Sequence, residues 1–182
     1  GTNTLDLQAK CPLRAFIERR LNAQPLDNLT RGLGFRLRGI ATHRALELFL
    51  RKLPTQRQLA EESRDCQQKW TQDCVKQALQ EVFGSLRRSL PNIYTLEYER
   101  LLRVTTSLLE NDLKRSAFSV AAVEERQNVA IKGYELVCRI DRIDSLASGG
   151  LAVIDYKTGS NIRTTDWLKP RLLDTQLPLY AQ

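Results

Sequence analysis

The sequence contains no methionine, a single histidine (His43) and no apolar run near the roughly 18–20 residues that cross a bilayer. We therefore expect no membrane partner. The polar start, residues 1–10, lacks the long apolar stretch of a secretory signal peptide. Because even the initiator methionine is missing, we expect a segment cut from a longer protein.

Cysteine is scarce and is not arranged for metal binding. Cys11, Cys66, Cys74 and Cys138 form no CxxC pair, which argues against a zinc knuckle. Cys66 and Cys74 are eight residues apart in a helical pattern, hence ~12 Å along the axis and too distant for a disulfide. We interpret all four as free thiols of a reducing compartment, and expect a cytoplasmic protein of the bacterial cytosol or nucleoid.

Positive charge is in excess, and it is unevenly distributed along the chain. The 182 residues carry a formal net charge of +7, and residues 1–52 hold ten Lys/Arg against four Asp/Glu. A one-sided positive field favours binding of a polyanion such as DNA, because neutralised phosphates release counterions. A solvated basic surface without a partner is the alternative. With 42% apolar residues, the chain has the composition of one globular domain.

Residues 1–117 show the helical spacing of apolar residues. Three-or-four spacing predicts helices at 12–21, 39–53, 55–90 and 94–115. The segment 22–34, which contains Pro25, Gly32 and Gly34, reads as a loop.

After residue 117 the spacing changes to the alternation of strands. Strands are predicted from 118, around 129–131, at 136–141 and at 151–156, with turns at 132–133 and 148–150 and a closing helix from about 174. The fold class is therefore α/β (α+β): a β-meander flanked by helices, plus a large N-terminal helical lobe. We expect a single domain, 1–182, truncated at its C-terminus, with the lobe at 1–117 and the catalytic sheet and closing helix at 118–182.

Two carboxylates and a lysine are expected to meet on this sheet. Asp155 and Lys157 share a strand face, and Asp141 lies fourteen residues back on the preceding strand, within reach across a turn. Two close carboxylates repel unless a hard cation such as Mg²⁺ lies between them. With a lysine beside it, that arrangement suits phosphodiester hydrolysis. Ordinary cross-strand ion pairing on a surface is the alternative.

Six motifs in order support a family resemblance. They are Cys11-Pro-Leu-Arg-Ala-Phe16, Gly39-Ile-Ala-Thr-His43-Arg-Ala-Leu-Glu47, Glu124, Arg139-Ile-Asp141-Arg-Ile-Asp144, Val153-Ile-Asp155-Tyr-Lys157-Thr-Gly159 and Gln176-Leu-Pro-Leu-Tyr180. Together they resemble the PD-(D/E)xK nuclease superfamily, and more narrowly its RecB-type branch with AddB-like C-terminal nuclease domains. The resemblance implies a restriction-endonuclease-like core.

The resemblance also implies a ligand set for Mg²⁺ or Mn²⁺. His43 is expected as a ligand from a helix, Asp141 and Asp155 as metal-bridging carboxylates, and the backbone carbonyl of Tyr156 as a further ligand. Lys157 is expected to position the attacking water or stabilise developing charge. A histidine of the core or the surface without a metal is the alternative for His43.

Other positions carry less specific expectations. Gln176 and Tyr180 share one helix face, which in the family lies over the active site and contacts the nucleic acid; plain helix packing is the alternative. Glu47 either orients His43 or is solvated. Glu124 either helps to hold the metal or caps the site. Arg142 and Asp144, of a kind that the family keeps at these positions, are interpreted as a surface pair without a chemical role.

Two departures from the family pattern concern cysteine. Cys138 stands where relatives usually have glycine, which is expected to crowd the site slightly. In some relatives a cysteine at the position of Cys11 joins three late cysteines around a [4Fe–4S] cluster. This chain lacks that trio, so a cluster is expected only in a longer parent protein.

The function implied is a metal-dependent deoxyribonuclease. We expect an exonuclease acting at linear or single-stranded DNA ends in recombinational repair, beside a helicase domain or subunit. In-line attack of an activated water would leave 5′-phosphate products. The alternatives are a catalytically silent DNA-binding scaffold of a helicase–nuclease complex, and a junction-resolving or CRISPR-adaptation nuclease.

Overall fold

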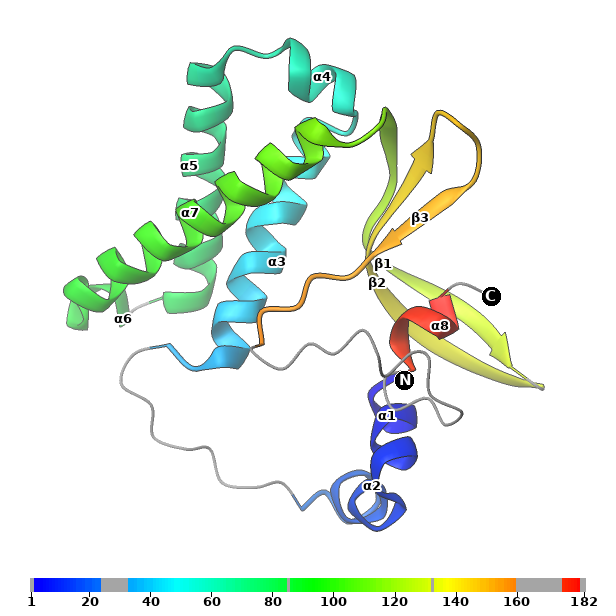
Figure 1. Cartoon of the computed structure of the whole chain (residues 1–182). Helices are drawn as coiled ribbons and strands as arrows, with labels where there is room; N and C mark the ends of the chain where they lie inside the picture. Colours follow the sequence, from blue (N-terminus) through cyan, green and yellow to red (C-terminus); the bar gives the residue numbers. More distant parts are fainter. Residues whose placement is uncertain (1, 24–32, 85, 132, 160–174, 181–182) are drawn as a thin grey trace. The chain divides into compact units, whose positions relative to one another are not determined.

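A computed structural model describes residues 2–23, 33–84, 86–131, 133–159 and 175–180 (Figure 1). Its elements are α1 (Thr2–Lys10), α2 (Pro12–Arg19), α3 (Phe35–Lys52), α4 (Gln56–Glu61), α5 (Arg64–Phe83), α6 (Leu86–Ser89), α7 (Pro91–Lys114), β1 (Phe118–Ile131), β2 (Tyr134–Leu146), β3 (Leu151–Ile154) and α8 (Gln176–Tyr180). Most of the predicted loop at 22–34, and Lys132 of a predicted turn, fall outside the described residues.

The chain divides into two compact units. Unit 1 comprises residues 1–29, 125–140 and 159–182, and unit 2 comprises residues 30–124 and 141–158. A single N-terminal helical lobe is not evident, because α1 and α2 belong to unit 1 and α3 to α7 to unit 2. The predicted change from helix to strand does occur between the end of α7 and the start of β1. The expectation of a single domain stays a prediction.

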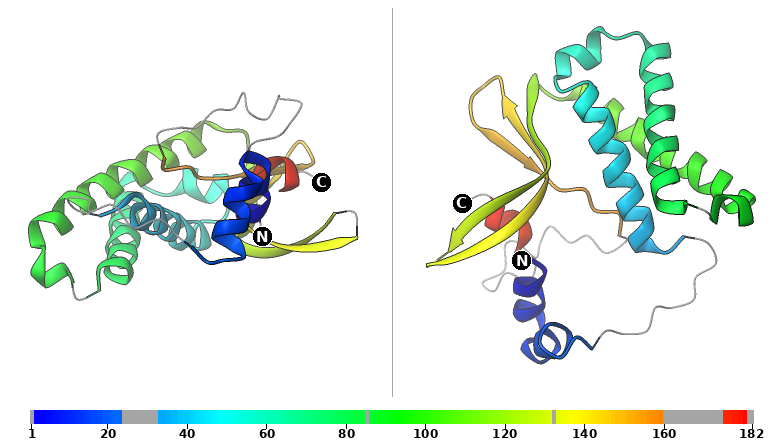
Figure 2. Two further views of the ribbon diagram at one scale, coloured as in Figure 1. Left: turned by 90° about the horizontal axis from the view of Figure 1, so that it is seen from below. Right: turned by 180° about the vertical axis from the view of Figure 1, so that it is seen from behind.

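Three helices form the core of unit 2. α3, α5 and α7 lie side by side in each view (Figures 1 and 2). Fully buried Ala41 and Ala45 on α3 meet Val75 and Leu79 on α5 and Leu101 on α7. The alanines are small enough for the helix axes to approach closely, so that larger side chains of the neighbours fill the space between them.

The predicted long helix at 55–90 is wrong, because it is three helices. Thr55 caps α4 by accepting a hydrogen bond from the backbone N–H of Gln58. Ser63 caps α5 in the same way, accepting from the N–H of Cys66, and so starts a new helix within the predicted one. Gly84, with φ of +48°, ends α5. Pro91 then occupies the first turn of α7, where its missing N–H costs nothing.

The sheet has three strands in the order β1-β2-β3, and β3 pairs antiparallel with β2. Gly149 and Gly150 turn the chain between them with φ near +90°, a conformation that glycine adopts without strain. β3 ends at Ile154, two residues earlier than predicted, so residues 155–158 follow it as an irregular segment. Helices with an antiparallel sheet are compatible with the restriction-endonuclease-like α/β fold that the resemblance implies.

Unit 1 holds the two ends of the chain. Asp6 on α1 accepts hydrogen bonds from the backbone N–H (2.8 Å) and the hydroxyl (2.5 Å) of Thr175, which directly precedes α8. In α2 the large apolar side chains Leu13, Phe16 and Ile17 are exposed, and only Ala15 is buried. Among the described residues, no helix combines the length and the apolar character needed to span a bilayer.

Candidate metal centre

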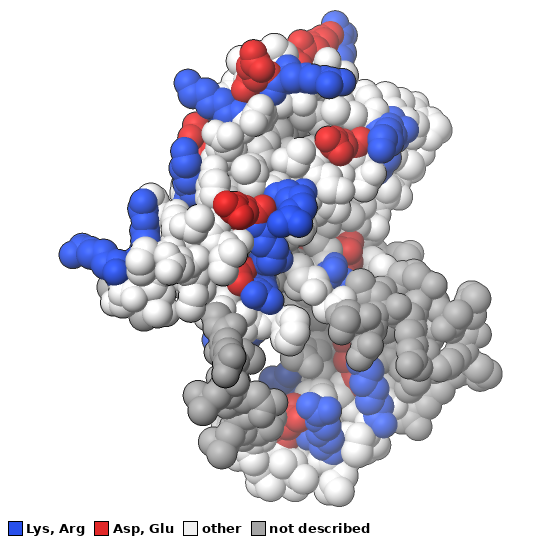
Figure 3. All heavy atoms as spheres, turned by 60° about the vertical axis from the view of Figure 1, so that its left-hand side comes forward, with Lys and Arg blue, Asp and Glu red and all other residues white. Residues whose placement is uncertain are grey.

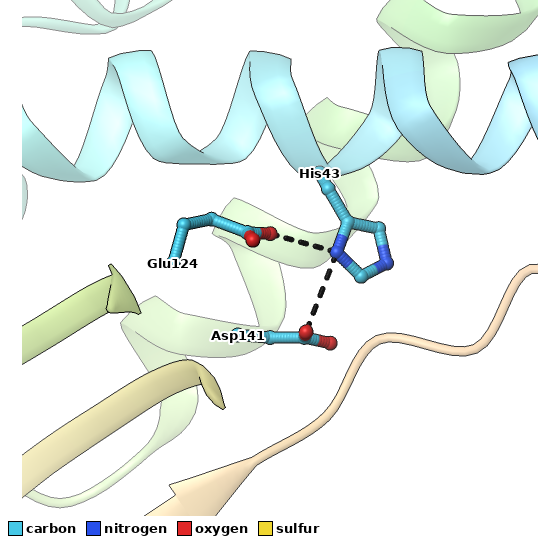
Figure 4. A group of neighbouring side chains, drawn as sticks. All are labelled: His43, Glu124 and Asp141. Carbon is cyan, nitrogen blue, oxygen red and sulfur yellow. Dashed lines mark hydrogen bonds and ion pairs between the residues drawn. The ribbon is translucent and has the colours of Figure 1, made fainter. Parts of the chain in front are cut away.

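One histidine and two carboxylates meet within unit 2. Nδ1 of His43, on α3, lies 2.8 Å from Oε1 of Glu124 on β1 and 3.5 Å from Oδ1 of Asp141 on β2 (Figure 4). One potential ligand atom from each residue lies within 4.8 Å of the other two. We call these three residues the His43 cluster. All three are at least partly buried, so helix α3 and two strands enclose the cluster.

The segment after β3 completes the surroundings of His43. Nε2 of His43 lies 2.9 Å from the carbonyl oxygen of Tyr156, and the N–H of Tyr156 donates to Oδ2 of Asp141 at 2.7 Å. The Tyr156 carbonyl oxygen accepts a hydrogen bond from Nε2, so Nε2 carries a proton in this arrangement. The Glu124 carboxylate at Nδ1 favours the protonated imidazole.

The environment raises the pKa values of His43 and Asp141. Burial lowers the pKa of His43, but the hydrogen bond to Glu124 and the charge of Asp141 outweigh it, and the pKa is raised above 6.5. Burial raises the pKa of Asp141 to about 6, although His43 and the Tyr156 N–H favour its ionised form. The charges of Asp155 and Glu124 contribute to this raised pKa, in smaller measure than burial.

Asp155 and Lys157 lie beside the cluster. β2 and β3 pair Arg142 with Ile154, so the next step of the same register sets Asp141 opposite Asp155. Only 3% of the Asp155 side chain is exposed, and its Oδ2 lies 2.8 Å from Nζ of Lys157. Oδ2 is shielded from solvent, and this contact lacks the geometry of a hydrogen bond. The charge of Asp155 raises the pKa of Asp141, so the two carboxylates lie near each other, although Asp155 follows β3 rather than belonging to it.

The donor set fits a hard divalent cation. Two carboxylates meet the imidazole of His43, and the charge of Asp155 acts on Asp141. Asp155 contacts the Lys157 ammonium group and has a buried oxygen without a hydrogen bond. Carboxylate oxygens, a carbonyl oxygen and an imidazole are ligands that Mg²⁺ and Mn²⁺ accept. A cation here would favour the ionised form of Asp141, whose pKa is raised by burial and by the charges of Asp155 and Glu124.

The glycine of the GxxxH motif has a steric reason. A Cβ added at Gly39, one helical turn before His43, would lie 3.3 Å from Oγ1 of Thr158. The missing side chain thus lets the segment that carries Asp155 and Lys157 approach helix α3.

In the part of unit 2 that the structure describes, Glu47 forms no hydrogen bond or ion pair with His43. Its two oxygens instead accept hydrogen bonds from Arg44 and Arg51 on the same helix, at 2.9 to 3.2 Å. The predicted orienting contact is made by Glu124, which comes from a strand far away in the sequence.

Gln176 and Tyr180 share a face of α8, as their spacing predicts. Nε2 of Gln176 donates to the Tyr180 hydroxyl at 3.2 Å, and that hydroxyl donates to the carbonyl of Arg139 at 2.8 Å. These residues belong to unit 1 and the His43 cluster to unit 2. Their expected contact with nucleic acid stays a prediction. Cys11 is an exposed and Cys138 a buried free thiol.

The sequence interpretation missed a buried ionic network. Arg142 and Asp144, taken for a surface pair, are 1% and 0% exposed. The alternation of β2 indicates this burial in the sequence. Arg142 and Asp144 share the strand face of buried Cys138 and Ile140, whereas Asp141 occupies the other face.

Several basic side chains of unit 2 are paired with acids. Arg38 contacts Glu97, and Arg44 bridges Glu47 and Glu81. On the face of the molecule shown in Figure 3, Lys and Arg side chains (blue) lie against Asp and Glu side chains (red). Part of the positive charge counted in residues 1–52 is thus neutralised locally.

A family model described as the PD-(D/E)XK nuclease superfamily matches residues 3–182. The chain belongs to this superfamily. A search among curated proteins found no match.

Proposed function

We propose that this chain is a Mg²⁺- or Mn²⁺-dependent deoxyribonuclease that hydrolyses phosphodiester bonds. Membership of the superfamily supports nuclease activity. The observation that carries the metal dependence is the convergence of His43, Glu124 and Asp141 beside the Asp155–Lys157 pair. Such a combination of carboxylates, imidazole and ammonium matches what phosphoryl transfer requires.

Each residue has a defined task in this proposal. His43, Asp141, Asp155 and the Tyr156 carbonyl hold the cation, with Glu124 as a further ligand or as the partner that orients the imidazole. The bound cation supplies a Lewis acid that polarises the phosphate and makes water more acidic. Nζ of Lys157, anchored 2.8 Å from Oδ2 of Asp155, orients the attacking water or donates to a phosphate oxygen as negative charge develops.

The finer function follows the RecB-type pattern of the motifs. We propose an exonuclease acting at DNA ends during recombinational repair in the cytoplasm, beside a helicase domain or subunit. The run from Arg139 to Asp144 and the pair Gln176 and Tyr180 support this assignment. In it, α8 contacts the DNA strand.

The test is cleavage of end-labelled linear and of closed circular DNA during titration with Mg²⁺ or Mn²⁺. We expect metal-dependent loss of linear DNA only, and at least a ~100-fold lower rate in Asp155→Asn. The matched control is Asp65→Asn, an exposed aspartate on α5 that should cleave normally. DNA binding without cleavage at any metal concentration would instead support the silent scaffold.

A further inference from the structure

Two arginines and two aspartates form a closed ring in unit 2. Arg142 donates from Nε to Oδ1 of Asp144 (2.6 Å) and from Nη1 to Oδ2 of Asp112 (2.5 Å). Nη1 of Arg115 lies 3.0 Å from Oδ1 of Asp112 and 2.8 Å from Oδ2 of Asp144. We call these four residues the arginine–aspartate ring.

Three of the four residues of the arginine–aspartate ring are buried. Arg142 and Asp144 are 1% and 0% exposed, and Asp112 is 8% exposed. The guanidinium carbons of Arg115 and Arg142 each lie 4.6 Å from the centre of the Phe118 ring. The Arg115 side chain is 30% exposed. Burying the other three charges costs desolvation free energy that mutual attraction only partly offsets, so stability alone is a weak reason for such a ring.

The arginine–aspartate ring has one contact that leads to the metal centre. Nη1 of Arg142 donates to the hydroxyl of Tyr156 at 3.1 Å. The backbone of the same tyrosine faces the His43 cluster, with its carbonyl 2.9 Å from Nε2 of His43 and its N–H 2.7 Å from Oδ2 of Asp141. Tyr156 is thus held at both ends.

The contact between Arg142 and the Tyr156 hydroxyl matters because few other contacts of the described residues fix the Tyr156 backbone. Tyr156 lies beyond the end of β3, where no ladder hydrogen bonds of the described sheet fix its backbone. Its ring stands edge-on to His43, with centroids 6.1 Å apart. The hydrogen bond to Arg142 therefore restrains the tyrosine side chain, and through it the direction of the carbonyl.

We propose that Arg142, locked by Asp112 and Asp144, is a positioning residue that aims the Tyr156 carbonyl at the cation site. The inference rests on the proposed function, because the carbonyl direction matters only when a cation binds beside His43. Groups behind a ligand commonly set metal affinity in this way.

The direct test is Tyr156→Phe, which removes only the hydroxyl contact and leaves the backbone and the aromatic ring. We expect Mn²⁺ binding, measured by electron paramagnetic resonance of free Mn²⁺, to weaken by about tenfold. The melting temperature should equal that of the control Tyr98→Phe, which removes a hydroxyl from a half-buried tyrosine on α7. Cleavage should recover at saturating Mn²⁺.

A second variant reaches the arginine–aspartate ring itself. Asp112→Asn loosens the hold on Arg142 while keeping the side-chain shape, so it should weaken Mn²⁺ binding in the same direction. Because His43 is the only histidine, its ¹⁵N signals report the site without assignment, and both variants should shift the Nε2 signal.

The outcomes separate the two proposals. If the unaltered chain cleaves DNA and binds Mn²⁺ but Tyr156→Phe binds it equally well, the positioning role is overturned and the proposed function stands. If the unaltered chain neither binds Mn²⁺ nor cleaves DNA, both proposals fail. A Tyr156→Phe variant that loses melting temperature but keeps its affinity shows a merely structural hydroxyl.

Discussion

Oε1 of Glu124 lies 2.8 Å from Nδ1 of His43, although 81 positions separate the two residues in the chain. Glu124 adopts φ of +51°, which a residue with a side chain rarely does. Such backbone strain persists only where surrounding contacts hold it, and it concentrates at functional sites. Here the strained residue is the one that directs a carboxylate at the imidazole.

Replacing Glu124 by glutamine should lower the pKa of His43, because the carboxylate hydrogen bond that raises it is lost. The same change should weaken Mn²⁺ binding by roughly 10–100-fold, as loss of a group behind a metal ligand commonly does. NMR titration of the single histidine and calorimetry with Mn²⁺ measure the two effects. Glu125→Gln, at an exposed neighbouring position, should change neither. An unaltered His43 pKa in Glu124→Gln would refute the role.

Metal binding should strengthen as pH rises from about 5.5 to 7.5. The cation needs ionised Asp141, whose pKa is about 6, and neutral His43, whose pKa is raised above 6.5. Both groups release protons when the cation binds. Calorimetry in buffers of different ionisation enthalpy counts these protons. A flat affinity profile over this range would contradict the assignment.

Stability without metal should depend on pH in the opposite sense. The folded pKa of Asp141 lies above its ordinary value of 3.8, so ionisation destabilises the folded state as pH rises from about 4 to about 6. The difference corresponds to roughly 3 kcal/mol. His43, with a raised pKa, stabilises the fold below pH 6.5 and loses this contribution above its folded pKa.

Asp141→Asn isolates the destabilisation caused by ionised Asp141, because the asparagine oxygen can still accept the hydrogen bond from the Tyr156 N–H. Urea unfolding with chelator at pH 4.5 to 7.5 should show the variant gaining stability relative to the unaltered chain up to about pH 6. A stability difference that is independent of pH would count against the burial of an ionised Asp141.

The parts of the site that depend on local spacing could be predicted from sequence. Asp141 lies near Asp155 because the register of β2 and β3 brings Arg142 opposite Ile154, and Gln176 meets Tyr180 because about four residues make one helical turn. The change from helical to alternating spacing correctly marked the start of β1 at Phe118.

Long-range pairing could not be predicted in this way. Glu47, one turn from His43, was a reasonable partner by spacing, but Arg44 and Arg51 are equally near and satisfy it. The choice of Glu124 depends on how β1 passes α3, which no local pattern encodes. Likewise the burial of Arg142 requires Asp112, thirty residues away on α7.

Lys157→Ala should separate catalysis from metal binding. Nζ lies against Asp155 and is not a ligand in the proposal, so removing it leaves one more uncompensated carboxylate charge near the cation. Mn²⁺ affinity should be equal or tighter, whereas the cleavage rate should fall at least ~100-fold. Lys69→Ala, at an exposed position on α5, is the control. Parallel loss of affinity and rate would move Lys157 into a structural role.

The core of unit 2 predicts that alanine substitutions on the buried and exposed faces of α7 change the free energy of unfolding by different amounts. Leu101 is fully buried against α3 and α5, so Leu101→Ala should lower the free energy of unfolding by about 2–5 kcal/mol. Leu96, on the same helix, is 65% exposed, and its replacement by alanine should change stability by less than about 0.5 kcal/mol. Urea denaturation compares the two variants, and equal effects would contradict the helix packing.

Gly39 should show coupling with Thr158. Alanine in a helix interior is favoured over glycine by about 1 kcal/mol, but here its Cβ would lie 3.3 Å from Oγ1 of Thr158, which must yield by a few tenths of an ångström. Gly39→Ala should therefore stabilise the chain more in a Thr158→Ala background than alone. A double-mutant cycle by urea unfolding measures this coupling. Because Thr158 directly follows Lys157, additive effects of the two changes would mean that Gly39 does not set the approach of the catalytic segment to α3.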